Sequence, residues 1–447
     1  PTGDVVFKDG ATVLGTVALA SGAASLTTRA LATGDHTLVA AYQGSGDFET
    51  SNSSGTTVLV DPRVGPEFRV NTVVAGSQQL PAATKLKAGG FVVTWSGQDG
   101  SSWGIFGQRY RADGSKDGSE FRINSTIAGA QSFPVIVGTA DGGFTTAWQS
   151  WPSPTASRFG IELRAQRWSA VGARLGSEFR LDSTIGSSLS APSLAAASGG
   201  GFASTWVSSR RTSAIYDVYA QLWDGSGKKV GSGLRVSAAA MATMGSSPAI
   251  ASLGGGGYVV VWASAATPSA KPVIKGQRLT AAGTKTGSEF AVTGASFVQG
   301  EPVVAGTADG GFVVAWTSLG QDGSGKGVYA QRYTAAGAKA GATFRVTTAT
   351  AGDQAEPSIA ARPGGGFTIA WTSSGQDGSG KGVYAQRYAA SGTPIDVEFR
   401  LNTTTAKDQS QPSLVVRGAT DFLATWTSFG QDGSLEGVYG QMYSVAP

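Results

Sequence analysis

The sequence predicts an all-β protein with two parts: a partial β-sandwich at residues 1–62 and a ring of seven four-stranded sheets at residues 63–447. Glycine accounts for 66 of the 447 residues and lies among many Val, Thr and Ser residues, which is typical of short strands joined by tight turns. After residue 62, an apolar strand that ends in tryptophan recurs seven times. Before residue 62, the alternating apolar residues lack this period.

The repeated unit is centred on a tryptophan, and successive tryptophans lie 53 to 58 residues apart. They are Trp95, Trp148, Trp206, Trp262, Trp316, Trp371 and Trp426. A glutamine follows each of them, at Gln108, Gln166, Gln221, Gln277, Gln331, Gln386 and Gln441. A proline precedes each of them, at Pro81, Pro134, Pro192, Pro248, Pro302, Pro357 and Pro412. Because every unit needs these positions, we predict structural roles: tryptophans buried between sheets, and glutamines hydrogen-bonded to backbone.

Each unit contains four strands: one at the proline, one that ends at the tryptophan, one with the glutamine, and one of the type Glu-Phe-Arg-Val. Four antiparallel strands that repeat radially form a blade of a β-propeller, so seven units predict seven blades. The first Glu-Phe-Arg-Val strand, at residues 67–71, precedes the first unit, whereas the last unit ends after Gln441 without one. We therefore expect residues 67–71 to complete the seventh blade beside the strand of Gln441.

Residues 1–62 show short alternating strands separated by Gly and Asp turns, as in a β-sandwich. The segments Pro1-Thr2-Gly3, Phe7-Lys8-Asp9-Gly10, 31–38 and 42–48 resemble the bacterial Ig-like repeat domains that occur in tandem in long surface proteins. Compared with that family, the segment begins at a middle strand. We expect either that the chain is a piece of a longer protein or that another chain supplies the missing strands by β-augmentation, which makes this edge a candidate for self-association.

Composition and charge exclude several classes of site and function. The chain has no Cys, which excludes disulfides and thiolate metal sites and suits an extracellular bacterial protein. It has no apolar run long enough to span a membrane, and a net charge of +4 is too small and dispersed for a nucleic-acid groove. Its single histidine, His36, lies outside the repeats, so a Ser-His-Asp triad in the propeller is excluded. A pair of carboxylates could still support glycosidase chemistry, but the acidic residues recur at positions that the repeat explains.

The motif Gln-Asp-Gly-Ser links the tryptophan strand to the glutamine strand in the first, fifth, sixth and seventh units. Its aspartates are Asp99, Asp322, Asp377 and Asp432. Asp-Gly is a strong hairpin-turn signal, which is one interpretation. The other is a Ca²⁺ loop, although each loop offers one carboxylate and Ca²⁺ takes 6–8 oxygen ligands. The sequence thus predicts no required cofactor, with Ca²⁺ as the candidate metal at these four aspartates.

Units two, three and four lack this motif, and their equivalent loops carry basic and aromatic residues instead. Loops that depart from a repeat often carry binding residues, although neutral drift of surface loops gives the same pattern. The predicted ligand-binding residues are Trp151, Arg158, Arg210, Arg211, Tyr216 and Lys271. Their charge favours an anionic partner such as an acidic glycan or a carboxylate-rich protein surface.

We therefore expect a non-catalytic binding or adhesion module of a secreted or cell-surface bacterial protein. One alternative is a structural subunit of an extracellular assembly, such as a surface layer or filament, completed by β-augmentation. The second alternative is a carbohydrate-active enzyme of the propeller type.

Overall fold

The computed structural model describes residues 2–28, 31, 34–99, 102–151, 161–182, 192–209, 215–242 and 247–444. In these ranges every regular element is a strand, and the strands form one five-stranded sheet followed by seven four-stranded sheets. The predicted all-β class is confirmed. Within the described ranges, no helix is long and apolar enough to span a membrane.

The seven four-stranded sheets are the blades of a β-propeller, and each runs from an innermost to an outermost strand. The innermost strands are β7 (Gln78–Lys85), β11 (Ala130–Gly138), β15 (Ser193–Ala196), β19 (Ala249–Ser252), β23 (Val298–Gly306), β27 (Gln354–Ala361) and β31 (Gln409–Val416). The second strands, which carry the repeated tryptophans, are β8 (Phe91–Gln98), β12 (Phe144–Trp151), β16 (Phe202–Ser209), β20 (Tyr258–Ser264), β24 (Phe312–Leu319), β28 (Phe367–Ser374) and β32 (Asp421–Phe429). Neighbouring innermost strands contact one another all round, and β31 contacts β7, which closes the ring.

The two outer strands of each blade carry the repeated glutamine and, in five of the seven blades, a Phe-Arg pair. The third strands are β9 (Trp103–Tyr110), β13 (Glu162–Trp168), β17 (Tyr216–Trp223), β21 (Val273–Leu279), β25 (Lys326–Tyr333), β29 (Lys381–Tyr388) and β33 (Glu436–Ser444). The outermost strands are β10 (Phe121–Arg122), β14 (Arg174–Arg180), β18 (Lys229–Arg235), β22 (Lys285–Ala291), β26 (Phe344–Arg345), β30 (Phe399–Arg400) and, in blade seven, β6 (Arg63–Arg69). The pairing of β6 with β33 joins Arg69 to Tyr439 and confirms that residues near the N-terminus complete the last blade.

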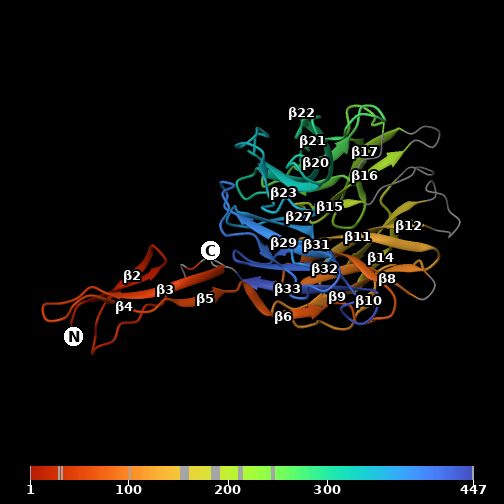
Figure 1. Cartoon of the computed structure of the whole chain (residues 1–447). Helices are drawn as coiled ribbons and strands as arrows, with labels where there is room; N and C mark the ends of the chain where they lie inside the picture. Colours follow the sequence, from red (N-terminus) through yellow and green to blue (C-terminus); the bar gives the residue numbers. More distant parts are fainter. Residues whose placement is uncertain are drawn as a thin grey trace.

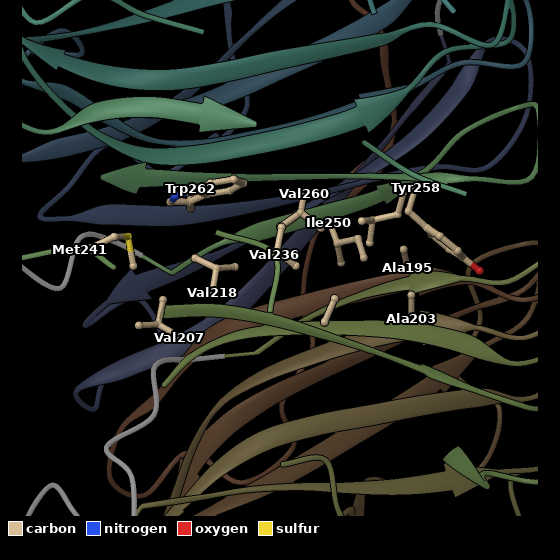
Figure 2. Close-up of a cluster of buried hydrophobic side chains, with 12 residues drawn as sticks. Ala195, Ala203, Val207, Val218, Val236, Met241, Ile250, Tyr258, Val260 and Trp262 are labelled. Carbon is tan, nitrogen blue, oxygen red and sulfur yellow. The ribbon is translucent and has the colours of Figure 1, made fainter. Parts of the chain in front are cut away.

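The cores lie between the blades, where sheets pack face to face. The seven repeated tryptophans are 0 to 3% exposed, as predicted. Figure 2 shows such a cluster, with Trp262 and Ile250 of blade four opposite Val207 and Ala203 of blade three. The repeated glutamines are buried as well and bind backbone: Nε2 of Gln108 donates to the carbonyl oxygens of Arg109 and Gly118 at 2.9 and 3.0 Å.

The residue before the repeated proline has a positive φ in five blades, at Leu80, Phe133, Glu301, Glu356 and Gln411. Each lies at a bulge of an innermost strand, where the pairing register shifts. Three of these side chains connect consecutive blades: the amide of Glu356 donates to Glu301, that of Gln411 donates to Glu356, and that of Leu80 donates to Gln411. The residues before these prolines therefore link blades five, six, seven and one in a series of hydrogen bonds.

The N-terminal segment forms one antiparallel sheet from β1 (Asp4–Asp9), β2 (Thr12–Ala18), β3 (Gly34–Tyr42), β4 (Ser51–Asn52) and β5 (Thr56–Val60). It extends from one side of the propeller next to β6 and β33 (Figure 1). Among the described side chains of its strands, only Val5 and Ala41 are buried, whereas Val13 in β2 and Phe48 before β4 are more than half exposed. This sheet therefore has little core of its own. Self-association through it stays a prediction.

Candidate active site

The hairpin between the second and third strands is shorter in blade one than in the blades with the same motif. In blade one the strands pair up to Gln98 and Trp103, so the loop spans residues 99–102. In blade five they pair up to Leu319 and Lys326, so the loop spans residues 320–325. Blade six has the longer loop too, because Ser374 pairs with Lys381. The four Gln-Asp-Gly-Ser motifs are therefore not equivalent in the fold.

The shorter loop changes the partner of a glutamate that recurs directly before the phenylalanine of the outermost strand. In blades six and seven the loop glutamine donates to this glutamate, Gln376 to Glu398 and Gln431 to Glu67. In blade one Gln98 instead accepts a hydrogen bond from the amide of Ser77 at 3.1 Å. Among the described residues, Glu120 accepts a single hydrogen bond, through Oε2 from the amide of Thr72 at 2.6 Å. Oε1 of Glu120 therefore lacks the hydrogen bond that a glutamine donates to Oε1 of Glu398 and Glu67.

A cleft of about 690 Å³ opens where this loop is shortened. Three parts of the chain line it: residues 73–78, which connect β6 to β7, the hairpin of β8 and β9, and residues 120–122 at the outermost strand. Its volume lies in the range of ligand-binding sites in proteins. The cleft belongs to blade one and lies beside the junction with blade seven.

The wall of the cleft is aromatic. Trp95 is 1% exposed and stacks on Phe106 with ring centroids 6.4 Å apart, while Trp103 is half-buried at the end of the hairpin. A side chain at Gly97 would place its Cβ 3.0 Å from the Phe106 ring, so glycine makes room for that ring. In the longer hairpins, serine takes the place of Gly97. The first residue of the third strand, which is Trp103 in blade one, is lysine or glutamate in these hairpins.

Two carboxylates and one guanidinium face this aromatic wall. Asp99 forms an ion pair with Arg122, and the exposed fractions of the two side chains are 9% and 30%. Oδ1 of Asp99 also accepts a hydrogen bond from the amide of Ser102 at 3.0 Å. The guanidinium lies 5.4 Å from the centre of the Phe106 ring, in a cation–π arrangement. Asp99, Glu120 and Arg122 all line the cleft.

The other three predicted metal-ligating aspartates have a different environment. Oδ1 of Asp322, Asp377 and Asp432 accepts a hydrogen bond from the amide of the serine two residues later, at 3.1 to 3.2 Å. These bonds are the turn chemistry that Asp-Gly indicates. In the described part of the chain, Oδ2 of each is buried without a hydrogen-bond partner, and no three His, Cys, Asp or Glu side chains gather to hold a metal. Calcium binding at these four aspartates stays a prediction.

The predicted ligand-binding residues lie elsewhere on the propeller. Arg158, Arg210 and Arg211 lie outside the described residues. Trp151 ends β12, and Tyr216 begins β17 and exchanges backbone hydrogen bonds with Met241. Nζ of Lys271 donates to the carbonyl of Ser296 at 2.8 Å. The three described residues do not line the blade-one cleft, and their binding role stays a prediction.

Sequence reasoning missed the cleft residues Trp103, Phe106, Glu120 and Arg122. A signal was present, because Gln98 follows Trp95 by three residues whereas Gln321 follows Trp316 by five. Trp103 also interrupts a position that is otherwise charged in the blades with this motif.

Comparisons with known proteins gave one family match and several structural matches. Residues 1–61 match the family model of the bacterial Ig-like domain (group 3). A crystal structure of a protein of unknown function from Dyadobacter fermentans has a TM-score of 0.52 at 13% identity and covers 85% of this chain and 98% of its own. An α-L-arabinanase of Penicillium chrysogenum has a TM-score of 0.48 at 12% identity, with 85% and 99% covered. An α-L-arabinofuranosidase of Fusarium graminearum has a TM-score of 0.48 at 11% identity, with 85% and 98% covered. No curated protein matches the sequence.

Two expectations from the sequence are contradicted by these comparisons: that the chain is a non-catalytic binding or adhesion module, and that it is not an enzyme. The similar propellers are mostly enzymes that act on carbohydrates, namely glycoside hydrolases and a polysaccharide lyase. At 9–13% identity the likeness shows the fold alone. Chemistry in this chain therefore has to be argued from its own residues.

Proposed function

We propose that this chain is an extracellular carbohydrate-active enzyme that cleaves a glycosidic bond in the blade-one cleft. The observation that carries the proposal is that two carboxylates, Asp99 and Glu120, line the same cleft as an aromatic wall. This cleft exists because blade one departs from the repeat. Where the repeat is kept in blades six and seven, the corresponding glutamate is covered by a glutamine.

The cleft offers what a saccharide requires. Sugar rings have an apolar face that packs on aromatic side chains, and Trp103 and Phe106 supply such a surface. Glycoside hydrolysis uses two carboxyl groups on either side of the scissile bond, one as the proton donor and one as nucleophile or base. Asp99 is the anionic member of an ion pair with Arg122, which suits the second role. Glu120 has one oxygen without a protein hydrogen bond in the described residues, which suits the first.

The extracellular location is part of the proposal. It is supported by the bacterial Ig-like domain at residues 1–61 and by a sequence without cysteine. The Ig-like sheet would act as a spacer that presents the propeller.

The test compares E120Q and D99N with the matched variants E398Q and D377N in blade six. Purified protein is incubated with a panel of neutral and acidic polysaccharides, and the release of new chain ends is measured. We expect activity from the wild type, a loss of about 100-fold or more in E120Q and D99N, and little change in the blade-six variants. Equal activity in all five proteins, or no activity of the wild type on any polysaccharide, would refute the proposal.

A further inference from the structure

The junction between blades three and four lacks an aromatic pair that the other six junctions contain. At those six, a phenylalanine of the outermost strand of one blade packs on an aromatic residue near the end of the third strand of the next blade. The pairs are Phe68–Tyr110, Phe121–Trp168, Phe179–Trp223, Phe290–Tyr333, Phe344–Tyr388 and Phe399–Tyr443. Their ring centroids lie 4.9 to 6.0 Å apart. At the junction of blades three and four, leucines occupy both positions, Leu234 and Leu279.

The same junction lacks a second connection. At four other junctions an arginine of the third strand donates to carbonyl oxygens of the next blade's turn, as Arg109 does to Ala170 and Val171 at 2.8 and 2.6 Å. The others are Arg167, Arg278 and Arg332. Blade three has Leu222 in this place, and its methyl group lies directly over the turn at Gly283. Blades three and four are therefore joined here without the arginine contact that four other junctions have.

A cavity of about 320 Å³ occupies the space that these replacements leave. Its apolar lining includes Leu222, Leu234, Ile250 and Leu279, and the polar side chains Gln221, Ser232 and Thr284 line it as well. Figure 2 shows Ile250 and Ala203 facing each other across the two sheets. The glutamate that precedes the outermost-strand phenylalanine in most blades is replaced here by Gly233, so no carboxylate enters the cavity.

We propose that this cavity binds the aromatic ring of a small apolar ligand. The fold holds a phenyl ring at this place in the six other junctions, which is the reason to expect a planar ring as the ligand. Because Leu222, Leu234, Ile250 and Leu279 line the cavity, a bound ring would regain the dispersion contacts that these side chains lack next to an empty space. The cavity shares no lining residue with the blade-one cleft, so this site is independent of the proposed function.

The test uses indole as the probe and the full chain as the protein. Binding is measured by isothermal titration calorimetry and by saturation-transfer NMR. L234F places the missing ring in the cavity, and L435F makes the same change at a residue that is 47% exposed in a loop of blade seven. We expect the wild type and L435F to bind indole equally, and L234F to bind it at least about tenfold more weakly. L279F provides a second filled variant if L234F does not fold.

Two results would overturn the proposal. If the wild type shows no indole binding at millimolar probe concentrations, the cavity is only a packing defect. If L234F and L279F bind indole as the wild type does, the probe occupies another site. A higher melting temperature of L234F together with lost binding would support the proposal, because the new side chain then fills the volume that the probe occupied.

Discussion

The backbone amide of Val438 donates to Oδ1 of Asn71 at 2.8 Å, across 367 residues of sequence. Asn71 is 1% exposed, and its Nδ2 donates to the carbonyl of Val73 and to Gln78. The Asn71 side chain therefore connects β33, the last strand of the chain, to the segment that follows β6, the first strand of the propeller. It lies in the blade that closes the ring.

We predict that N71A increases hydrogen exchange in blade seven, which closes the ring, more than N124A increases it in blade one. Asn124 makes the matching contacts: its Oδ1 accepts from the amide of Ile105 at 2.8 Å, within the covalently continuous blade one, and its Nδ2 donates to Gln131. Each change leaves buried polar groups unpaired and should lower the free energy of unfolding by about 1–3 kcal/mol. Only N71A should also accelerate hydrogen exchange in β6 and β33, measured by mass spectrometry. Equal protection of these two strands in both variants would show that Asn71 has no special role in closure.

The repeated tryptophans give a prediction about stability. Trp371 is fully buried between blades. W371A removes its ring from a packed core and should lower the free energy of unfolding by about 3–5 kcal/mol, measured by denaturant titration. A decrease below about 1 kcal/mol would contradict the structural role of the repeated tryptophan.

Alkaline pH should destabilise the propeller through its buried tyrosines. Burial, aided by the nearby Asp377 carboxylate, raises the pKa of Tyr384 from 10.0 to about 12. Between these pH values the unfolded chain has lost the phenolic proton that the folded chain keeps, so the free energy of unfolding falls as pH rises. Burial raises the pKa of Tyr439 to about 12 in the same way. Y384F/Y439F should therefore show a shallower loss of stability from pH 10 to 12 than the wild type, measured by urea unfolding. If the free energy of unfolding falls equally steeply with pH in the variant and the wild type, Tyr384 and Tyr439 do not cause the alkaline destabilisation.

Trp103 should determine saccharide affinity if the proposed function holds. W103A removes an aromatic surface of the cleft and should raise KM for the active polysaccharide by about tenfold with a smaller change in kcat. K326A, at the matching hairpin position of blade five, is the control and should leave both constants unchanged. Because Trp103 is half-buried at a hairpin end, we expect its loss to change the melting temperature little. An unaltered KM in W103A would show that Trp103 does not contribute to saccharide binding.

Much of the fold follows from the spacing of tryptophan, glutamine and proline. Each repeat is one sheet that buries its faces only against its neighbours, so seven repeats predict seven blades. The unpaired Phe-Arg-Val strand at residues 67–71 also predicts the closure that the pairing of Arg69 with Tyr439 confirms. The function expected from the same pattern was wrong, because a pattern of repeats reports what all blades share.

The sequence by itself determined the number of blades, the position of the buried tryptophans and the strand that closes the ring, since local alternation and period encode these directly. Only the tertiary structure decided which departures from the repeat matter. Glu120 looks like every other glutamate of its kind in the sequence, yet it lies uncovered because a hairpin two residues shorter turns Gln98 toward Ser77. Leu234 and Leu279 lie 45 positions apart in the sequence, and they leave a cavity only because neighbouring blades bring them together. The short spacing from Trp95 to Gln98 is visible in the sequence, but packing between segments distant in sequence forms the cleft and the cavity.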